Sequence, residues 1–174
     1  MAMDFNIRPA NFDEYDLLAD VERSAAQRFL QVGLADIAEA EPTDAEFIGT
    51  VAAFGGAFVA ARQEDDAPVG FILVGILDRA AHIYELSVAE DYGRQGIGRL
   101  LIEEASRYAG AEGVTALTLS TFRDVPWNGP FYEQLGFRYL SRAEWTPALH
   151  ILHKLEKLNR LPVKRRAFMR WDGE

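Results

Sequence analysis

Cysteine is absent from this chain of 174 residues. No disulfide can form, and no thiolate is available as a nucleophile or as a metal ligand. The absence fits a reducing compartment, so we expect a cytoplasmic protein. Histidine is also scarce. His150 and His153 lie three residues apart without a third ligand beside them, so we expect no metal site.

Long apolar runs and excess positive charge are missing as well. The longest uncharged run, residues 47–61, is shorter than the ~20 residues of a membrane span, and Gly55 and Gly56 divide it. The first ten residues, MAMDFNIRPA, lack the basic and apolar regions of a signal peptide. The net charge of −9 disfavours a polyanionic partner. We therefore expect neither a membrane nor a nucleic acid as partner.

Apolar periodicity predicts one α+β domain over residues 1–174. The three strands expected between residues 58 and 88 form an antiparallel meander, and a crossover then joins parallel strands. These elements make a mixed, mostly antiparallel sheet flanked by helices, an α/β/α-like arrangement. Strands are expected around residues 5–7, at 58–61, 69–77, 81–88 and 114–119, from 137, and at 166–170; helices are expected from 12, and at 26–38, 42–54, 96–110, 128–135 and 147–158.

Glycines gather just before the helix expected at 96–110. The stretch EDYGRQGIGRLL, residues 90–101, contains Gly93, Gly96 and Gly98. A helix N-terminus presents unpaired N–H groups, and glycines let an anion such as phosphate approach them closely. The spacing is the reverse of a dinucleotide loop, and the Lys and Ser/Thr of a P-loop are missing. The alternative is that these glycines only allow tight packing of helix on strand.

The reversed spacing resembles the acetyl-CoA loop of the GNAT superfamily of acyltransferases. Residues 88–101, VAEDYGRQGIGRLL, are similar to its pattern Gln/Arg-x-x-Gly-x-Gly/Ala after a strand that ends in Val. Gly93 stands in the Gln/Arg place, and Arg94 follows it. A second segment, PWNGPFYEQLGF at residues 126–137, resembles the "FYxxLGF" helix and strand of the same family. The order and separation of the two segments also match.

The resemblance implies a GNAT fold and an acetyl-CoA-dependent N-acetyltransferase. The acetyl group would pass to a primary amine of a small molecule or peptide, by direct attack in a ternary complex. A homodimer is common among such relatives. The residues implied for donor binding are Leu86, Ser87, Val88, Gly93, Arg94, Gln95, Gly96, Ile97, Gly98, Arg99, Asn128 and Phe131. For Arg94 and Arg99 the alternative is a solvated helix face.

Glu85 is the candidate general base, because the attacking amine must lose a proton. It lies three residues before Val88 in an otherwise apolar strand. Alternation places Glu85 on one face of the strand with Ile83 and Ser87, and places Tyr84 and Leu86 on the opposite face. The alternative is a glutamate that faces solvent on one side of the sheet.

Tyr132 matches the tyrosine of the "FY" pair, which the resemblance implies as general acid for the leaving thiolate. A phenol with a pKa of ~10 can supply this proton. The alternative is a core tyrosine with its hydroxyl at the rim. Phe131 beside it serves core packing in our interpretation.

The loop before Tyr132 departs from the usual family form. Relatives often carry Asn seven residues before the Tyr, where this chain has Val125. Asn128 is interpreted first as an N-cap, and a contact to the arm of the donor is the alternative. Phe122 and Trp127 either line the acceptor site or belong to the core. The resemblance adds Phe29 to the acceptor region.

Two rival functions remain open. A non-catalytic acyl-CoA sensor would keep the glycine loop and need no general base. A nucleotide-binding oxidoreductase would require a Rossmann-like sheet and the other glycine spacing.

Overall fold

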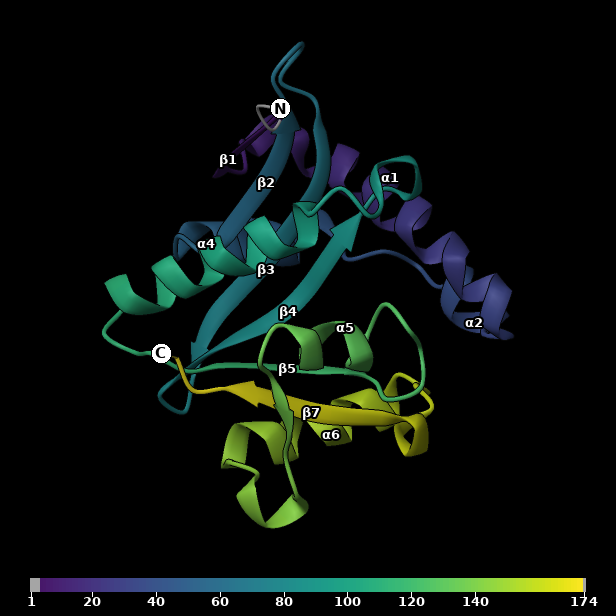
Figure 1. Ribbon diagram of the computed structural model, residues 1–174, viewed down its shortest axis with the longest axis vertical. Coiled ribbons are helices and arrows are strands. Elements are labelled where there is room, and N and C mark those ends of the chain that lie inside the picture. Colours follow the sequence, from purple (N-terminus) through teal and green to yellow (C-terminus); the bar gives the residue numbers. More distant parts are fainter. Residues whose placement is uncertain (1–3, 174) are drawn as a thin grey trace.

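The computed structural model (Figure 1) describes residues 4–173. Residues 1–3 of the N-terminal stretch and residue 174 of the expected domain lie outside the described residues. A seven-stranded sheet with the order β1-β2-β3-β4-β5-β7-β6 runs through the protein. Its strands are β1 (Phe5–Pro9), β2 (Ala57–Arg62), β3 (Pro68–Leu77), β4 (Ala80–Val88), β5 (Leu117–Phe122), β6 (Arg138–Tyr139) and β7 (Arg166–Trp171).

The predicted mixed, mostly antiparallel sheet is confirmed. Strands β1 to β4 pair in antiparallel order, β5 pairs with β7 and β6 with β7 in the same sense, and only β4 and β5 are parallel among the described strands. The connection from β4 through α4 to β5 is the expected crossover between parallel strands. The α-helices are α1 (Tyr15–Ala26), α2 (Ala35–Ala38), α3 (Ala45–Ala53), α4 (Ile97–Ala111), α5 (Gly129–Gln134) and α6 (Pro147–Leu158).

Short 3₁₀ segments complete the chain. One of them corrects the helix expected at residues 26–38, which is a 3₁₀ segment followed by the single turn of α2. Gly33 separates the two, with a left-handed φ of 73° that an α-helix does not contain. The 3₁₀ segments are η1 (Phe12–Glu14), η2 (Gln27–Val32), η3 (Glu90–Tyr92), η4 (Arg142–Glu144) and η5 (Val163–Arg165).

Helices cover both faces of the sheet because side chains alternate along β3. Ile72 and Val74 belong to the apolar cluster under α4, which includes Leu101. Phe71 and Leu73 belong to the cluster under α1 and α3 on the opposite face. Each fully buried aliphatic or aromatic side chain of this kind contributes roughly 1.5–3 kcal/mol to folding. The sheet is thereby anchored on both sides around β3 and β4.

The predicted alternation along β4 is wrong at one point. Glu85 pairs with Leu73 of β3, but the next pair along the ladder joins Ile83 to Val74, so Tyr84 is an extra residue in a β-bulge. The bulge reverses the phase of the strand. Ile83 therefore lies with Leu86 on the face of the sheet that α4 covers, whereas Tyr84 packs in the cluster under α1 and α3.

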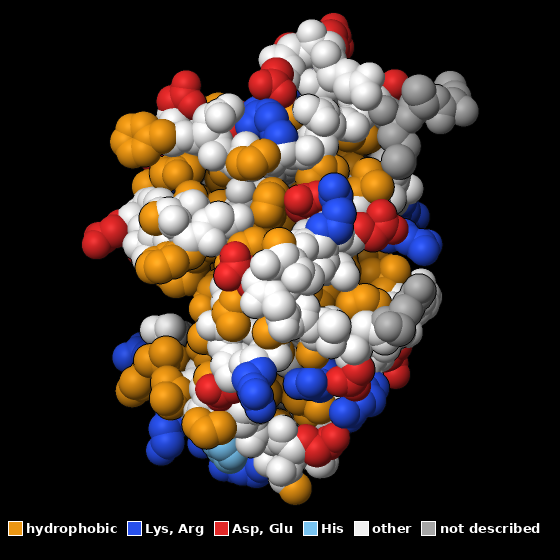
Figure 2. All heavy atoms as spheres, turned by 90° about the vertical axis from the view of Figure 1, so that its left-hand side faces the viewer, with side chains coloured by type: hydrophobic (Ala, Val, Ile, Leu, Met, Phe, Trp, Pro, Cys, Tyr) orange, Lys and Arg blue, Asp and Glu red, His pale blue; other side chains and the backbone are white. Residues whose placement is uncertain are grey.

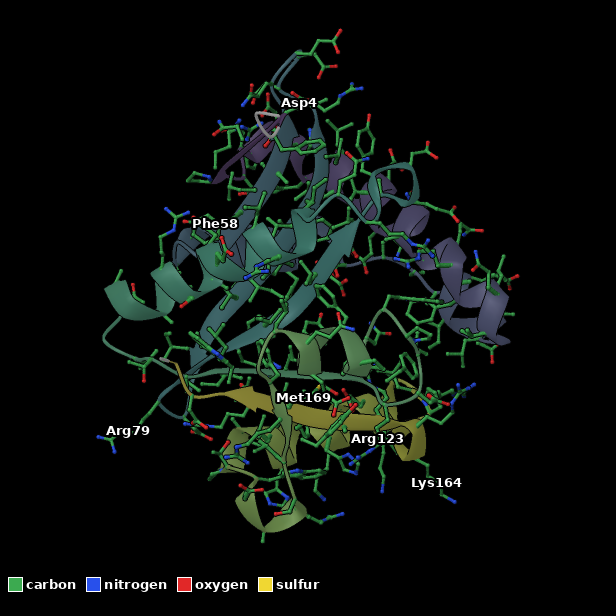
Figure 3. All side chains as sticks on the ribbon, viewed as in Figure 1. Asp4, Phe58, Arg79, Arg123, Lys164 and Met169 are labelled. Carbon is green, nitrogen blue, oxygen red and sulfur yellow. The ribbon has the colours of Figure 1, made fainter. Side chains whose placement is uncertain are left out.

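Surface charge is mixed in sign. On the face in Figure 2, acidic and basic side chains lie interspersed among apolar ones. The basic run at residues 164–166 is likewise divided: Figure 3 shows Lys164 pointing outward, while Arg165 pairs with Asp124 at 2.9 Å and Arg166 turns inward. Within residues 4–173, none of the helices is long and apolar enough to cross a membrane.

Candidate active site

The two central strands separate and leave a cavity between them. β4 and β5 pair only through residues 81–83 and 117–119. Beyond this seam the strands diverge, toward the right-hand side of Figure 1. The cavity between them measures about 700 Å³ and is lined from α1, β4, the start of α4, β5, α5, α6 and β7. A concave space of this size is typical of a small-molecule site.

The diverging part of β4 offers an unpaired backbone edge. The N–H of Ala89 donates to the carbonyl of Val69 in β3 at 2.8 Å. Because N–H directions alternate along a strand, the N–H of Val88 points to the opposite edge, where β5 has already moved away. An extended, amide-containing ligand can pair with this edge as an added strand does.

The loop before α4 forms a second set of free donors. Gly96 adopts a left-handed φ of 81° as the N-cap of α4, and Arg94 adopts a φ of 62°. Among the described residues, no acceptor is recorded for the backbone N–H groups of residues 94–99, which we term the N–H cradle. The cradle stands at the positive end of the α4 dipole. This geometry suits an anion such as a pyrophosphate.

The two arginines of the loop differ in their surroundings. The side chain of Arg99 is exposed and pairs with Glu103 one turn further along α4, at 3.3 Å, a contact of small energetic value. Arg94 is exposed, and within residues 4–173 no ion pair engages it. Its guanidinium is therefore the freer of the two for a ligand.

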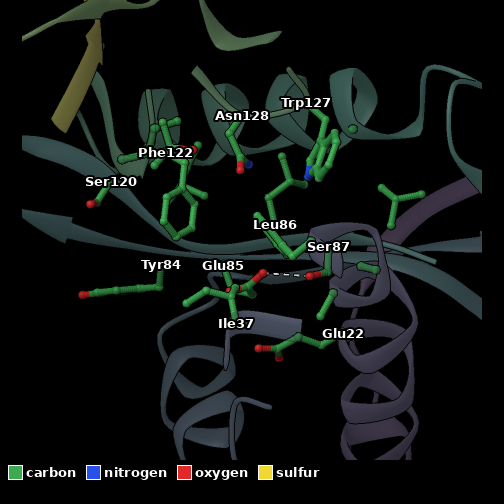
Figure 4. Close-up of a pocket in the computed structure, with 18 of the residues that line it drawn as sticks. Glu22, Ile37, Tyr84, Glu85, Leu86, Ser87, Ser120, Phe122, Trp127 and Asn128 are labelled. Carbon is green, nitrogen blue, oxygen red and sulfur yellow. Dashed lines mark hydrogen bonds between the residues drawn. The ribbon is translucent and has the colours of Figure 1, made fainter. Parts of the chain in front are cut away.

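Asn128 is not the helix cap that its position predicts. Its backbone angles are φ −113° and ψ −109°, and its side chain makes no capping hydrogen bond. Instead the Oδ1 atom is buried, and no described residue donates to it. Asn128 lines the cavity, and Figure 4 shows it reaching down from the loop before α5. A buried acceptor without a partner is costly, so this atom is suited to an N–H group of a ligand.

Tyr132 lines the cavity and is itself buried. It is only 7% exposed, and its ring packs edge-on against Phe131 and Phe137 at centroid distances of 5.2 and 5.6 Å. Burial, and then the charge of Glu85, raise the pKa of its hydroxyl well above the ordinary value. No hydrogen bond of this hydroxyl to another described residue is recorded. The phenol therefore keeps its proton and has it free for a ligand.

Glu85 lies on the wall of the same cavity. The hydroxyl of Ser87 donates to its Oε1 at 2.7 Å, the dashed contact in Figure 4. Burial raises the pKa of Glu85, while the Ser87 hydroxyl and the charge of Arg166 oppose that rise. The predicted pairing with Ser87 on one face is confirmed, and the solvent-facing alternative does not describe this environment.

Glu22, on α1, is a titratable group of the cavity that the sequence analysis does not identify. The backbone N–H and the hydroxyl of Thr43 donate to its two carboxylate oxygens, at 2.9 and 3.3 Å. Burial and then the charge of Glu85 raise the pKa of Glu22 to about 7. A signal exists in the sequence: Glu22 follows Leu18 by four residues, so an acidic group occupies the apolar face of the helix.

Three aromatic side chains form part of the cavity lining. Phe29 packs against Phe122 and Trp127, with ring centroids 5.6 and 5.7 Å apart. The guanidinium of Arg28 stacks on Trp127 at 4.4 Å. The three aromatic residues therefore serve both interpretations at once, because they form a small apolar cluster and also line the cavity.

A buried ion pair also lines the cavity. Arg166 of β7 and Glu156 of α6 lie 3.0 Å apart, with side chains only 15% and 13% exposed. Ser120 of β5 contacts both of them. The sequence pattern does not reveal this pair, because its members come from distant elements. Within residues 4–173, no group of three or more His, Cys, Asp or Glu side chains is placed to hold a metal ion.

The sequence profile of the acetyltransferase (GNAT) family matches residues 18–137, more than half of the chain. The chain belongs to this family. The GNAT topology, with its single parallel pair, also excludes the Rossmann-like sheet that the oxidoreductase alternative requires.

Solved structures of other GNAT proteins share the fold. The PaiA N-acetyltransferase of Thermoplasma acidophilum, crystallised with coenzyme A, gives a TM-score of 0.71 at 17% identity, over 98% of this chain and 99% of that one. A GNAT acetyltransferase of Staphylococcus aureus Mu50 gives 0.70 at 16%, over 98% and 99%. The ribosomal-protein-S18-alanine N-acetyltransferase of Escherichia coli gives 0.66 at 18%, over 98% and 95%.

Most residues that the GNAT resemblance implies meet in one place. Glu85, Tyr132 and the three aromatic candidates line the cavity together with the predicted donor-binding residues. Gln95 is the exception: it is exposed and does not line the cavity, although its backbone N–H belongs to the N–H cradle. The roles of these residues remain predictions.

Proposed function

We propose that this GNAT domain transfers an acetyl group from acetyl-CoA to a primary amine of a small molecule or peptide, by direct attack in a ternary complex. One observation carries the proposal: the gap between β4 and β5 brings the unpaired strand edge, the N–H cradle and the hydroxyl of Tyr132 to a single cavity. An acyl-CoA thioester needs these three features together, for its arm, its pyrophosphate and its leaving sulfur.

The residues of the cavity fit the donor along its length. The N–H cradle would hold the pyrophosphate, with Arg94 adding a charge-assisted contact. The edge of β4 would pair with the amides of the pantetheine arm, and the unpartnered Oδ1 of Asn128 would accept from one of its N–H groups. The N–H of Val88 would polarise the thioester carbonyl, a contribution of ~10²–10³ in rate for a well-placed donor. When bound, the donor supplies an activated acetyl carbon for attack.

The protein's own groups handle the protons. An ammonium group with a pKa of ~10.4 is almost fully protonated at pH 7, so it must lose a proton before its nitrogen can attack. Glu85 is placed to accept this proton. Tyr132 would donate its proton to the departing thiolate, and its raised pKa ensures that the phenol is protonated before the reaction starts.

The acceptor belongs to the broad class of primary amines. The family relatives include a ribosomal-protein-alanine N-acetyltransferase from Brucella melitensis and an N-acetylglutamate synthase from Neisseria gonorrhoeae, whose acceptors differ in size. A cytoplasmic location, supported by the absence of cysteine, is part of the proposal. The homodimer implied by the resemblance stays a prediction.

Calorimetry with acetyl-CoA tests donor binding. Gly96→Asp adds a negative charge inside the N–H cradle, and we expect it to abolish the micromolar binding of the unmodified protein. Gly113→Asp is the matched control, because Gly113 is also left-handed, with a φ of 78°, also has open space around it and lies beyond the other end of α4. Loss of binding in both variants, or in neither, would contradict the assignment of the cradle.

Release of free thiol tests transfer. Acetyl-CoA is offered with 1,4-diaminobutane, with an amino acid and with a tetrapeptide that has a free N-terminus. Thiol release that depends on one of these amines supports the enzyme. Tight binding of acetyl-CoA without amine-dependent release would favour the non-catalytic sensor instead.

A further inference from the structure

Glu22 and Glu85 line the cavity from two different elements, α1 and β4. Figure 4 shows both side chains below the edge of β4, that of Glu85 directed toward Ser87 and that of Glu22 on the neighbouring helix. Each is held by neutral donors: Thr43 binds both oxygens of Glu22, and the Ser87 hydroxyl binds one oxygen of Glu85. Both side chains line the same cavity, so both are open to a ligand.

No cation neutralises the two carboxylates directly. Among the described residues, neither forms an ion pair. The cations whose charges act on them are engaged elsewhere: Arg23 pairs with Asp20 at 2.9 Å on the exposed side of α1, and Arg166 pairs with Glu156. The remaining acidic group of this wall, Glu41, is exposed. Two like charges inside a partly buried site are unfavourable, so the fully ionised pair binds a proton more tightly than a lone carboxylate does.

We propose, on the basis of the proposed function, that Glu22 and Glu85 form a pair of carboxylates that together accept the one proton that the acceptor ammonium must lose. Glu22 is thereby a catalytic residue, and Glu85 alone does not account for proton removal. The negative charge of the pair also attracts the ammonium group into the cavity.

The proton steps of the pair balance. An N–H bond of the ammonium breaks, its electrons stay on nitrogen, and the proton binds one of the two carboxylates, so that the pair then carries one proton and one negative charge. The nitrogen forms its bond to the acetyl carbon and the carbon–sulfur bond breaks. The sulfur takes the proton of Tyr132, and Tyr132 regains one from the nitrogen as the amide forms. The pair finally releases its extra proton to water.

A pair suits this task better than one ordinary carboxylate. A glutamate with a pKa near 4.3 is a weak base toward an ammonium group. The charge of Glu85 helps to raise the pKa of Glu22 to about 7, which brings the acceptor of the proton closer to the pH at which the reaction runs. The pair therefore owes its basicity to the repulsion between two carboxylates in one cavity.

The pH dependence of kcat/KM distinguishes this role from a structural one. The assay uses acetyl-CoA and whichever of the three amines named above the unmodified protein acetylates. We expect a bend in its profile near pH 7. Glu85→Gln removes the neighbouring charge and should lower the bend by about one pH unit as well as the rate. Glu22→Gln should reduce kcat/KM by about 100-fold, with the affinity for acetyl-CoA unchanged.

Glu39→Gln is the matched control. Glu39 lies at the end of α2, is exposed and does not line the cavity, so its substitution removes one charge from the same side of the protein. We expect no change in rate or profile. If Glu22→Gln kept kcat/KM within twofold and left the bend in place while the unmodified protein was active, the proposed pair would be wrong and the proposed function would stand.

An acceptor-independent measurement separates the two proposals. If none of the amines is acetylated, the proposed function fails, and NMR titration of ¹³C-labelled glutamate side chains still tests the pair. We expect one carboxyl to titrate near pH 7, to be absent in Glu22→Gln and to titrate at lower pH in Glu85→Gln. Titration of every glutamate below about pH 5.5 would overturn the proposed pair.

Discussion

Gly98 in the first turn of α4 faces the ring of Phe131 in α5. A Cβ atom built on Gly98 would lie 3.4 Å from Cζ of Phe131, an ordinary van der Waals distance. The glycine loop and the "FY" segment, which are separated by about thirty residues in the sequence, therefore touch in the structure. Both residues line the cavity, together with Tyr132.

Alanine at Gly98 and alanine at Gly96 should have opposite effects on stability. At Gly98 the added methyl makes a normal contact and improves helix propensity, so we expect a gain of about 0.5 kcal/mol in the free energy of unfolding. At Gly96 nothing lies within 4 Å of the new Cβ, but the φ of 81° strains it, so we expect a loss of about 1 kcal/mol. Urea denaturation of both variants measures the difference, and effects of equal sign would contradict this account.

Tyr132→Phe should impair catalysis and spare the fold. The substitution keeps the ring that packs against Phe131 and Phe137 and removes only the hydroxyl. We expect kcat to fall by ~10²-fold or more, with the affinity for acetyl-CoA and the melting temperature little changed. Steady-state kinetics beside calorimetry check this expectation, and an unchanged kcat would remove Tyr132 from the mechanism.

Asn128→Ala should weaken donor binding without weakening the protein. The Oδ1 atom has no described partner to lose, and its removal relieves the burial of an unpaired acceptor, so we expect the free energy of unfolding to stay the same or to rise. Loss of a hydrogen bond to the donor arm should raise the Kd for acetyl-CoA by about fivefold. The reverse pattern, a less stable protein that binds acetyl-CoA equally well, would show that Asn128 serves the fold.

His82 should make the protein sensitive to mild acid. Burial lowers its pKa from 6.5 to about 4, and its Nδ1 lies 2.9 Å from the hydroxyl of Thr118. The unfolded chain binds the proton more tightly, so stability is present above pH 6.5 and is lost as the pH falls through about 4, by about 3 kcal/mol in full.

The partner of His82 must be removed together with it, because Thr118 is also buried. We compare the unmodified protein with the double variant His82→Leu, Thr118→Val in denaturant titrations at pH 7 and pH 4. The double variant should lose less stability over this interval. Equal losses in the two proteins would show that His82 does not govern the acid sensitivity.

The contribution of Glu22 to the free energy of unfolding should depend on pH in the opposite direction to that of His82. Its pKa is raised to about 7 in the folded protein, so its stabilising contribution is present below about pH 4.5 and is lost as the pH rises through 7. Glu22→Gln keeps an oxygen that can accept from Thr43 and cannot ionise. We expect this variant to be more stable than the unmodified protein by about 1–2 kcal/mol at pH 8, and equally stable at pH 4.5. A variant less stable at both pH values would contradict the shifted pKa.

Local patterns were sufficient to predict much of this fold. The antiparallel meander follows from the apolar runs between Phe58 and Val88, and the crossover follows from the glycine loop before α4. The two motifs also identify one end of the cavity. In these segments the local preference of the chain and its final packing agree.

Other features depend on contacts between distant segments and have no local signal. The bulge at Tyr84 does not interrupt the apolar pattern, and the divergence of β4 from β5 depends on how each strand packs on its helices. Asparagine is a favoured residue type at the N-cap of a helix, but the backbone of Asn128 takes another conformation. The partnership of Glu22 with Glu85 joins α1 to β4 across more than sixty residues of sequence, so only the assembled fold reveals it.

The open edge of β4 separates two tasks along one short segment. Main-chain atoms of residues 84–88 face the gap that the donor would fill, whereas the side chains of Glu85 and Ser87 form part of the wall that the acceptor would meet. Main-chain groups are the same for every amino acid except proline. Under the proposed function, substitutions at Ser87, with Glu85 retained as proton acceptor, can therefore change which amine is accepted while recognition of the acetyl carrier stays intact.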